Sequence, residues 1–441
     1  MKSILNHLNK SSPSIGLGLF RILFGLIMLW EVIYFYRIGL IEKFIFLPAT
    51  LFNYDFLPLS PMSEPAMQII LAGMLLSAVL ITIGYYFRMA SFYLFLSLSY
   101  IHLLDKGLYN NHIYLICLVC LMFSISNADA SLTLKKSRTS PQIPRWQYLI
   151  FQIHIAMVYF FGGIAKINPY WLNMHPVKEI LAIRAKNSGF EFISTPLVEN
   201  FIMYGGLIFD MSIPFLLWYK RTRMPAIILA LFFNLSNAWI FRDINIFPFF
   251  MMGALILFLD QDKVESYLKR FNLPISKQKI QVRKLTKSLL IVLSLYFIIH
   301  FILPFRHFLY PGYVDWTGEG QHFAWRMKIQ HREIVEMKFA LFDLDKREIH
   351  EIDPKNLINL SQYQQMSLHP RMAVQFAEYL KQLALKKLRI RNCMVKSKIK
   401  VTFNGSEPLY VFDPDFDLLQ ISNRRSSINE FLNSAPQARN Y

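Results

Sequence analysis

Charged residues are scarce in this chain, and their scarcity argues against an ordinary soluble protein. Only 17% of the 441 residues are charged, whereas 54% are hydrophobic and 39 are phenylalanine. The mean hydropathy is +0.32. Several apolar runs approach the roughly 20 residues that a helix needs to cross a bilayer. The composition therefore predicts a polytopic membrane protein rather than two or three soluble domains.

Cysteine is scarcer still, with three residues in the whole chain. Cys117 and Cys120 lie one helical turn apart inside an apolar run, and Cys393 stands alone near the C-terminus. This pattern favours small packing residues over a redox pair. The sequence also lacks metal-ligand spacing and internal repeats, so we expect no bound metal.

The positive charge does not indicate a nucleic-acid partner. Residues 1–303 contain 27 basic and 14 acidic residues, and residues 304–441 contain 20 and 15. The excess thus lies mainly in the apolar part, where loop charge sets membrane orientation. The first apolar run, Ile15 to Tyr36, is too long for a signal peptide and is followed by no small-residue cleavage site, so we expect a retained helix.

The apolar runs predict nine membrane spans, at about 15–36, 67–87, 90–104, 110–127, 146–166, 200–219, 224–241, 243–260 and 285–303. With the N-terminus inside, the inner segments hold 18 basic residues and the outer loops 8. The positive-inside rule therefore predicts that the N-terminus is cytoplasmic and the C-terminus is outside. A very tight outer turn at Arg242–Asp243 joins the seventh and eighth spans.

After Phe305 the pattern becomes that of a soluble α+β domain. Residues 322–343 alternate apolar and polar side chains like strands, and residues 369–388 form an amphipathic helical stripe that begins at Pro370. Asn404–Gly405 predicts a hairpin turn. We therefore predict a helical bundle over 1–303, an extracytoplasmic α+β domain over 304–441, and a loosely ordered tail from Arg424.

Three polar clusters fall at the same predicted outer depth, at residues 105–112, 166–171 and 237–245. They come from different helices, and a bundle would build an outward-facing site from them. The cluster at 166–171 follows an apolar helix that ends in Gly162-Gly163 and then Lys166. A lysine there is costly unless it reaches water or has a use.

Two interpretations of Lys166 are open. Burial disfavours the ammonium form and can turn a lysine into a base, and Gly162 and Gly163 would let a flat ligand approach the backbone. Alternatively, Lys166 reaches out to the headgroups beside Trp171, an interfacial anchor. Asn110, Asn111 and His112 open the fourth span and could relay a proton, or Asn110 could simply cap that helix.

Other polar residues sit inside the spans. Asp210 is expected to pair with a buried basic or amide group, in a structural role. Asn234 and Asn237 lie on one helical face, where they could bind a polar headgroup or bridge helices. His154 lies deeper in the Lys166 helix and is expected to be structural.

Four motifs then carry a resemblance to a known family. They are LDKGLYNNHIYL at 104–115, VYFFGGIAKINPYW at 158–171, GGLIFDMSIPFLL at 205–217 and LYPGYVDWTGEGQHFAWRM at 309–327. In this order they resemble the vitamin K-dependent γ-glutamyl carboxylases and their bacterial relatives in the HTTM group. The similarity runs from about Gly16 to Arg332.

The resemblance implies a reaction and roles for residues. It implies that vitamin K hydroquinone, or menaquinol, is oxidised by O2 to its epoxide while CO2 is added to a glutamate of a peptide or protein. Lys166 would be the base, His112 its assistant, and Asn111 would lie beside them. Trp325 and Met327 match the fourth motif and, with Gly162, Gly163, Asn110, Asn234 and Asn237, are candidate cofactor-binding residues.

The sequence also departs from the family's pattern. Asn234-Leu-Ser-Asn237 stands where the family commonly has H-x-x-N, Asn245 replaces a usual glycine, and Arg326 and Lys328 differ from the animal enzymes. Two alternatives therefore stay open: quinol oxygenation without peptide carboxylation, and a non-enzymatic quinone or lipid carrier. Richness in Lys, Asn, Ile and Phe suggests a bacterial plasma membrane, with lipid as the surrounding partner.

Overall fold

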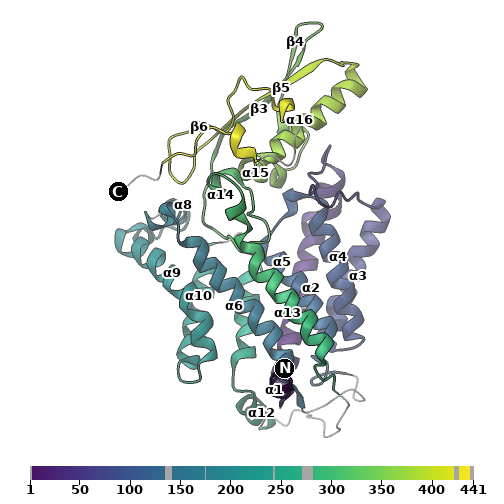
Figure 1. Ribbon diagram of the computed structural model, residues 1–441, viewed down its shortest axis with the longest axis vertical. Coiled ribbons are helices and arrows are strands. Elements are labelled where there is room, and N and C mark those ends of the chain that lie inside the picture. The colour runs from purple at the N-terminus through teal and green to yellow at the C-terminus, as the bar shows by residue number, and fades with distance from the viewer. Residues whose placement is uncertain are drawn as a thin grey trace.

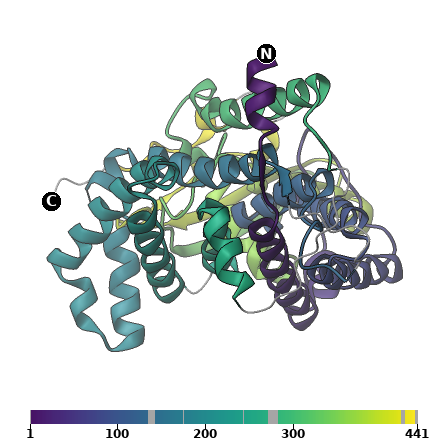
Figure 2. The same cartoon turned by 90° about the horizontal axis from the view of Figure 1, so that it is seen from below.

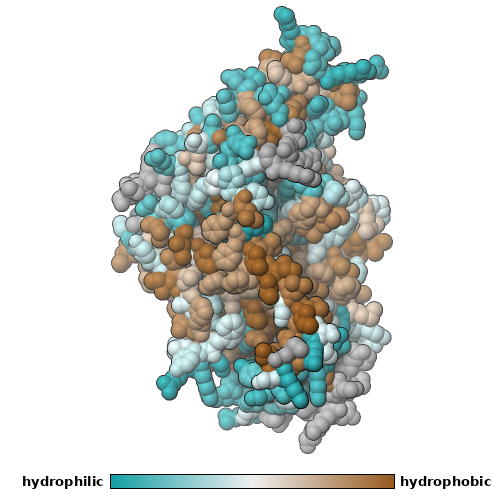
Figure 3. Space-filling model, viewed as in Figure 1, coloured by the Kyte–Doolittle hydropathy of each residue, from teal (hydrophilic) through white to brown (hydrophobic). Residues whose placement is uncertain are grey.

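The computed structural model describes residues 2–134, 142–173, 175–241, 244–270, 282–421 and 427–437. Its larger part is a bundle of apolar helices, and a smaller α/β part sits on one end of that bundle (Figure 1). Viewed from below, the helices are spread over a broad area rather than packed around one axis (Figure 2). On the face that Figure 3 shows, a wide hydrophobic belt crosses the bundle between two hydrophilic ends.

The bundle is built from helices of very different lengths. They are α1 (Lys2–Leu8), α2 (Ile15–Ile38), η1 (Leu40–Phe46), α3 (Glu64–Ile83), α4 (Phe87–Leu104), η2 (Lys106–Leu108), α5 (Asn111–Ile125), α6 (Trp146–Lys166), α7 (Pro169–Leu172), α8 (Val177–Ser188), η4 (Glu191–Ser194), α9 (Pro196–Trp218), α10 (Arg223–Ile240), α11 (Phe247–Ala254), η6 (Leu255–Phe258), α12 (Gln261–Lys269), α13 (Lys287–Ile302) and η7 (Leu303–Leu309). Two short strands, β1 (Ser11–Pro13) and β2 (Gln142–Pro144), pair antiparallel.

Within the described residues, seven helices are long and apolar enough to cross a membrane: α2, α3, α4, α6, α9, α10 and α13 with η7. The predicted spans at 110–127 and 243–260 correspond to shorter apolar helices of 10–17 residues. The first begins only after Asn110, whose side chain caps it, and ends at the extended residue Ser126. The second has Pro248 in its first turn. The count of nine spans and the orientation therefore stay predictions.

Some residues used in the sequence argument lie outside the described ranges. They are the tight turn at Arg242–Asp243, the basic residues at 135–141 and 271–281, and the tail positions 422–426 and 438–441.

A buried arginine links the N-terminal part of α2 to the C-terminal ends of α3 and α5. The guanidinium of Arg21 on α2 donates hydrogen bonds to the carbonyls of Ile81 and Thr82 at the end of α3, and to those of Ala128, Ser131 and Leu132 after α5. Helix ends leave such carbonyls without intrahelical partners. The arginine therefore satisfies them while they solvate its charge, which keeps the α2, α3 and α5 ends together.

The α/β part is a four-stranded antiparallel sheet with one face covered by a helix. The strand order is β4 (Glu348–Ile352), β3 (Ile334–Asp343), β5 (Cys393–Val401), β6 (Leu409–Tyr410). Met337, Phe339 and Leu341 point from β3 into the core with Phe376 of α16 (Arg371–Leu383). The helix η9 (Ala384–Leu388) continues α16, so the predicted amphipathic helix at 369–388 is confirmed.

The predicted hairpin is also confirmed. Strands β5 and β6 pair with Val401 opposite Leu409, and the connecting turn contains Asn404 and Gly405 with φ of 47° and 74°. Asparagine and glycine tolerate this left-handed conformation best. The remaining helices of the α/β part are α14 (Val314–Thr317), η8 (Pro354–Asn356), α15 (Leu360–Leu368), η10 (Leu418–Gln420) and η11 (Ile428–Phe431).

The prediction of strands from residue 322 onward is wrong over its first half. Residues 318–333, which we call the strap, are irregular, and β3 begins only at Ile334. Phe323, Trp325 and Lys328 each have a φ between 55° and 58°, which a strand does not allow. The alternation at 322–333 instead reflects a segment lying between the bundle and the α/β part, so its side chains are buried without strand pairing.

The strap and α15 join the α/β part to the bundle through buried polar contacts. Asp105, which follows α4, accepts hydrogen bonds from Gln362 of α15 and from the backbone N–H groups of Phe52 and Gly107. Beside them, the rings of His322 and His369 stack at 4.3 Å. Burial lowers the pKa of His369 to about 3, with Arg332 and Lys106 adding to the effect. Burial also lowers the pKa of His322.

Acidification should therefore weaken this junction. A histidine whose folded pKa is depressed stays neutral in the native state while the unfolded chain takes up a proton below pH ~6.5, so stability falls as the pH falls. For His369 the loss between pH 7 and pH 5 should be about 2 kcal/mol. The check is the apparent unfolding midpoint of the detergent-solubilised protein across this range. His369→Gln should flatten the profile, whereas His7→Gln on the exposed helix α1 should not; an unchanged profile in His369→Gln would contradict the expectation.

Candidate functional site

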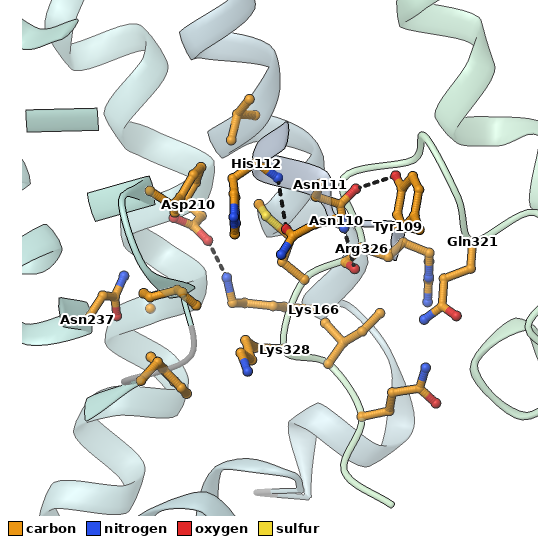
Figure 4. Close-up of a pocket in the computed structure, with 18 of the residues that line it drawn as sticks. Tyr109, Asn110, Asn111, His112, Lys166, Asp210, Asn237, Gln321, Arg326 and Lys328 are labelled. Atoms are coloured by element: carbon orange, nitrogen blue, oxygen red, sulfur yellow. Dashed lines mark hydrogen bonds and ion pairs between the residues drawn. The ribbon is translucent and has the colours of Figure 1, made fainter. Parts of the chain in front are cut away.

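A cavity of about 420 Å³ lies where the bundle meets the strap. Its walls come from the segment before α5, the C-terminal end of α6, the helices α9 and α10, the strap and α15. Figure 4 shows the side chains around it. Its polar and titratable lining residues include Tyr109, Asn110, Asn111, His112, Lys166, Asp210, Asn234, Asn237, Gln321, Arg326 and Lys328.

An ion pair between Lys166 and Asp210 occupies one end of this cavity. The ammonium of Lys166 donates a hydrogen bond to Asp210 Oδ2, and the side chains are only 12% and 8% exposed. Figure 4 shows the side chain of Lys166 extending toward Asp210. The expectation that Asp210 pairs with a buried basic group is therefore confirmed. The sequence did not identify Lys166 as that partner.

The exposed-lysine alternative does not fit this geometry. Lys166 Nζ lies 5.2 Å from the ring centroid of Trp171. Trp171 is itself buried, and its indole N–H donates to the carbonyl of Met203 at 3.2 Å. The tryptophan therefore packs against the lysine and α9 rather than anchoring the chain at a headgroup surface.

The Asn-Asn-His segment forms the wall next to this pair. Asn110 caps α5 by accepting the backbone N–H of His112 at 3.1 Å. This places the His112 ring in the first turn, 6.2 Å from the Phe247 ring and on the cavity side (Figure 4). Asn110 therefore caps α5, as one of the two interpretations of the sequence predicted, and this contact also positions the backbone of His112.

Asn111 connects the bundle to the strap. Its Oδ1 accepts a hydrogen bond from the Tyr109 hydroxyl at 2.8 Å, and its Nδ2 donates to the carbonyl of Arg326 at 3.3 Å. The Tyr109 hydroxyl in turn accepts the backbone N–H of Phe323. Arg326 is held by a two-pronged ion pair with Asp315. Asn111 therefore helps to fix the strap across the cavity.

The other candidate residues divide into two groups. Asn234, Asn237 and Met327 line the cavity, and Asn234 also bridges α10 to α6 through the Tyr159 hydroxyl at 3.0 Å. Gly162 and Gly163 are not among its lining residues: an added Cβ would approach Asp210 at 3.5 Å and Met211 at 2.8 Å. Gly163 therefore permits close packing of α6 against α9, whereas a Cβ at Gly162 would be at ordinary van der Waals distance. The structure gives no support to a ligand lying on either glycine.

Two further residues lie away from the cavity. Trp325 belongs to the strap but is buried, and it stacks on Tyr114 with 4.9 Å between the ring centroids. His154 contacts the carbonyl of Ile150 and the Tyr296 hydroxyl, which fits the expected structural role. Sequence reasoning missed Tyr109, which lies in the same motif as His112, and the glutamines of the strap and α15, which no motif marks.

A second cavity, of about 520 Å³, lies between α6, α9 and α13. Its lining is apolar or aromatic throughout: Ile153, Ala156, Met157, Phe160, Pro214, Phe215, Trp218, Phe297, Ile298, Phe301 and Ile302. None of these side chains can accept or donate a proton except the Trp218 indole N–H. Of these two cavities, only the first has titratable side chains such as Lys166, Asp210 and His112 in its lining.

Two protein-family models match the chain. Residues 9–263 match the HTTM domain, so the chain is an HTTM-domain protein. Residues 285–437 match the lumenal domain of vitamin K-dependent gamma-carboxylase. The two matches together show that the chain belongs to the vitamin K-dependent gamma-carboxylase family, which confirms the resemblance found in the sequence. The second match includes α13, which the predicted boundary at 303 assigns to the bundle. No solved structure matches the chain.

The buried pair predicts strong energetic coupling between its partners. Lys166→Met or Asp210→Asn alone leaves one buried group without its partner and should destabilise the protein by about 3–5 kcal/mol. The double variant should lose at least about 2 kcal/mol less than the sum of the single losses. Reversible unfolding in mixed micelles measures this cycle.

A control cycle uses an exposed pair of the same types. Lys396 and Asp415 lie 3.0 Å apart, and Asp415 is 90% exposed. Lys396→Met and Asp415→Asn should couple by less than about 1 kcal/mol. Additive losses at Lys166 and Asp210 would contradict a tight buried pair.

Proposed function

We propose that this chain is an integral-membrane vitamin K-dependent carboxylase that couples oxidation of a quinol to carboxylation of peptide-bound glutamate. The observation that carries the proposal is the convergence of Lys166, Asp210 and His112 on one partly enclosed cavity. The family supplies the reaction class, and the cavity supplies groups able to hold and move a proton.

The lining of the cavity fits a flat aromatic quinol. Its volume of about 420 Å³ falls within the usual range for small-molecule sites. Tyr159, Phe233, Phe241, Phe247 and Trp171 contribute aromatic walls, and Lys166 and His112 can reach a ring oxygen from two sides. An added Cβ at Gly206, on the α9 wall, would have open space around it, which suits lateral entry of a lipid-borne ligand.

When bound, vitamin K hydroquinone supplies the reducing power that O2 consumes. The residues of the chain have to accept one proton from the quinol hydroxyl and hold it. Lys166 accepts a proton only in its neutral form, and a carboxyl group in contact with Nζ can hold the proton that the lysine releases. The Lys166–Asp210 pair therefore acts as one neutral unit, because separating a charge in a poorly hydrated site is costly.

His112 and the strap have supporting roles in this proposal. His112 lies in the first turn of α5, where Asn110 accepts its backbone N–H, and a histidine can accept or donate a proton near neutral pH. The strap excludes water, which prevents a reactive base from being quenched. Glutamate would enter from the side of the α/β part, and CO2 and O2 would diffuse in as neutral gases.

The proposed orientation puts this cavity on the outer face of the plasma membrane. It rests on the positive-inside bias of the predicted loops and on the hydrophobic belt of the bundle (Figure 3). In that orientation membrane lipid surrounds the seven long apolar helices, and the α/β part faces the periplasm or the extracellular medium.

Purified protein in lipid nanodiscs tests the proposal directly. With vitamin K hydroquinone, O2, radiolabelled CO2 and a glutamate-containing peptide, the wild type should form both quinone epoxide and labelled peptide. Lys166→Met should lower epoxide formation by at least about 100-fold, because general-base catalysis contributes that much or more. Lys186→Met, on the exposed face of α8, is the matched control and should keep full activity.

The two products separate the competing functions. Epoxide without labelled peptide would favour quinol oxygenation alone. Quinone binding without any turnover would favour a carrier. Epoxide formation that survives Lys166→Met would refute the assignment of the base.

A further inference from the structure

The end of the α/β part that lies farthest from the bundle is strongly basic (Figure 1). It consists of the β3–β4 turn at 344–348 and the segment 385–392 that leads from η9 to β5, and we call it the basic tip. The backbone N–H of Leu344 donates to the carbonyl of Asn392 at 3.0 Å, and Asn392 Nδ2 donates to Asp345 at 3.2 Å, so the two segments form one surface. Figure 3 shows hydrophilic side chains projecting at this end. The exposed cations of the basic tip are Lys346, Arg347, Lys386, Lys387, Arg389 and Arg391.

These cations are not used to hold the α/β part together. None of the six forms an ion pair with another residue that the structure describes. The acidic residues of the basic tip are Asp345, which accepts the hydrogen bond from Asn392, and Glu348. Below the turn, buried Asp343 accepts the backbone N–H groups of Asp345 and Lys346. An excess of positive charge therefore faces the solvent.

Two of the arginines occupy backbone positions that disfavour them. Arg347 and Arg389 have φ of 60° and 58°. Such left-handed positions are usually taken by glycine or asparagine, because other side chains crowd the backbone there. The turn at Asn404–Gly405, at the other end of the same sheet, follows that rule. Turn geometry therefore does not account for the arginines, whereas a use for their charge does.

The helix end explains only part of the charge. Lys386 and Lys387 lie in the last turn of η9, where cations stabilise the C-terminal end of a helix. Arg391 lies beyond that end, and Arg347 belongs to a turn between strands. A helix-dipole role therefore leaves these two unexplained.

Exposed leucines between the cations limit the kind of partner. Leu385 and Leu388 are 44% and 53% exposed and lie three positions apart, on the same side of η9. Across the tip, Leu344 is 42% exposed. A polyphosphate or sugar-phosphate chain offers negative charge but little apolar surface, whereas an acidic polypeptide offers both. The apolar helices lie at the other end of the molecule, which places the headgroups of the surrounding membrane away from the tip (Figure 1).

We propose that the basic tip is a docking surface for an acidic segment of another protein. Carboxylates of the partner face the six cations, and its apolar side chains cover Leu385 and Leu388. Opposite charges speed association and fix orientation, and the apolar contact adds affinity. This inference goes beyond the proposed function and does not depend on it, because docking needs neither a quinol nor Lys166.

Equilibrium binding of a defined peptide tests the charge contribution. The probe is a fluorescein-labelled peptide of four Glu-Glu-Leu-Glu repeats, titrated into the full-length protein in neutral-lipid nanodiscs at physiological ionic strength and followed by anisotropy. Arg389→Gln combined with Arg391→Gln should weaken binding by about tenfold.

A matched control removes the same charge from the same sheet. Lys338 and Lys398 lie opposite each other on β3 and β5, away from the basic tip, and Lys338 is 59% exposed. Lys338→Gln combined with Lys398→Gln should change binding by less than about twofold, because salt screens charges beyond about 8 Å. Equal losses in the two double variants would overturn the proposal.

A second peptide on the wild-type protein tests the apolar contribution without any substitution in the chain. Four Glu-Glu-Ser-Glu repeats keep the charge and should bind at least about fivefold more weakly. Leu385→Ser combined with Leu388→Ser should remove that difference between the peptides. Equal binding of both peptides to the wild type, or polyphosphate that competes equally well at the same charge concentration, would identify a general polyanion site and overturn the proposal. Absence of peptide binding would overturn it as well.

Discussion

The contact between Lys166 and Asp210 is the interaction on which the rest of the site depends. A lysine at the end of an apolar helix normally extends toward water, and an aspartate within an apolar helix normally needs a partner. Here the two groups hydrogen-bond to each other, so the buried pair carries no net charge. Gly163 allows α6 and α9 to pack closely next to this contact.

The α/β part completes the site rather than sitting beside it. The strap lies between the bundle and the α/β part and is held by Asn111, by the Tyr109 hydroxyl and by the Arg326–Asp315 pair. Without these contacts the Lys166 end would open to water, and its electrostatics would weaken. The same segment contributes Met327 and Lys328 to the lining, so one element both closes the cavity and forms part of its wall.

The sequence predicted the bundle well because long apolar runs bounded by charges have few alternatives. It also predicted the amphipathic helix α16 and the turn at Asn404–Gly405, since both signals are local. The prediction of strands in the strap was wrong. Its apolar and polar residues alternate because the segment is buried between the bundle and the α/β part. The positive φ angles of Phe323, Trp325 and Lys328 cannot be recognised from the periodicity of the sequence.

Within the site, the sequence identified Lys166 and His112 by their unusual setting, and it predicted that Asp210 would be paired. It did not show which residue pairs with it, because Lys166 and Asp210 are 44 positions apart and meet only after α6 and α9 pack. The glutamines of the strap and α15 were missed for a different reason. A glutamine in an outer segment is ordinary until the fold places it on the wall of a cavity.

A structure of the wild-type protein with vitamin K quinone bound, determined by electron cryomicroscopy in nanodiscs, tests the central claim most directly. The account predicts that the ring lies in the cavity between α5, α6, α9 and α10, with one ring oxygen within hydrogen-bond distance of Lys166 or His112 and with Asp210 still paired to Lys166. A ring seated instead in the apolar cavity between α6, α9 and α13, away from any group that can move a proton, would contradict it.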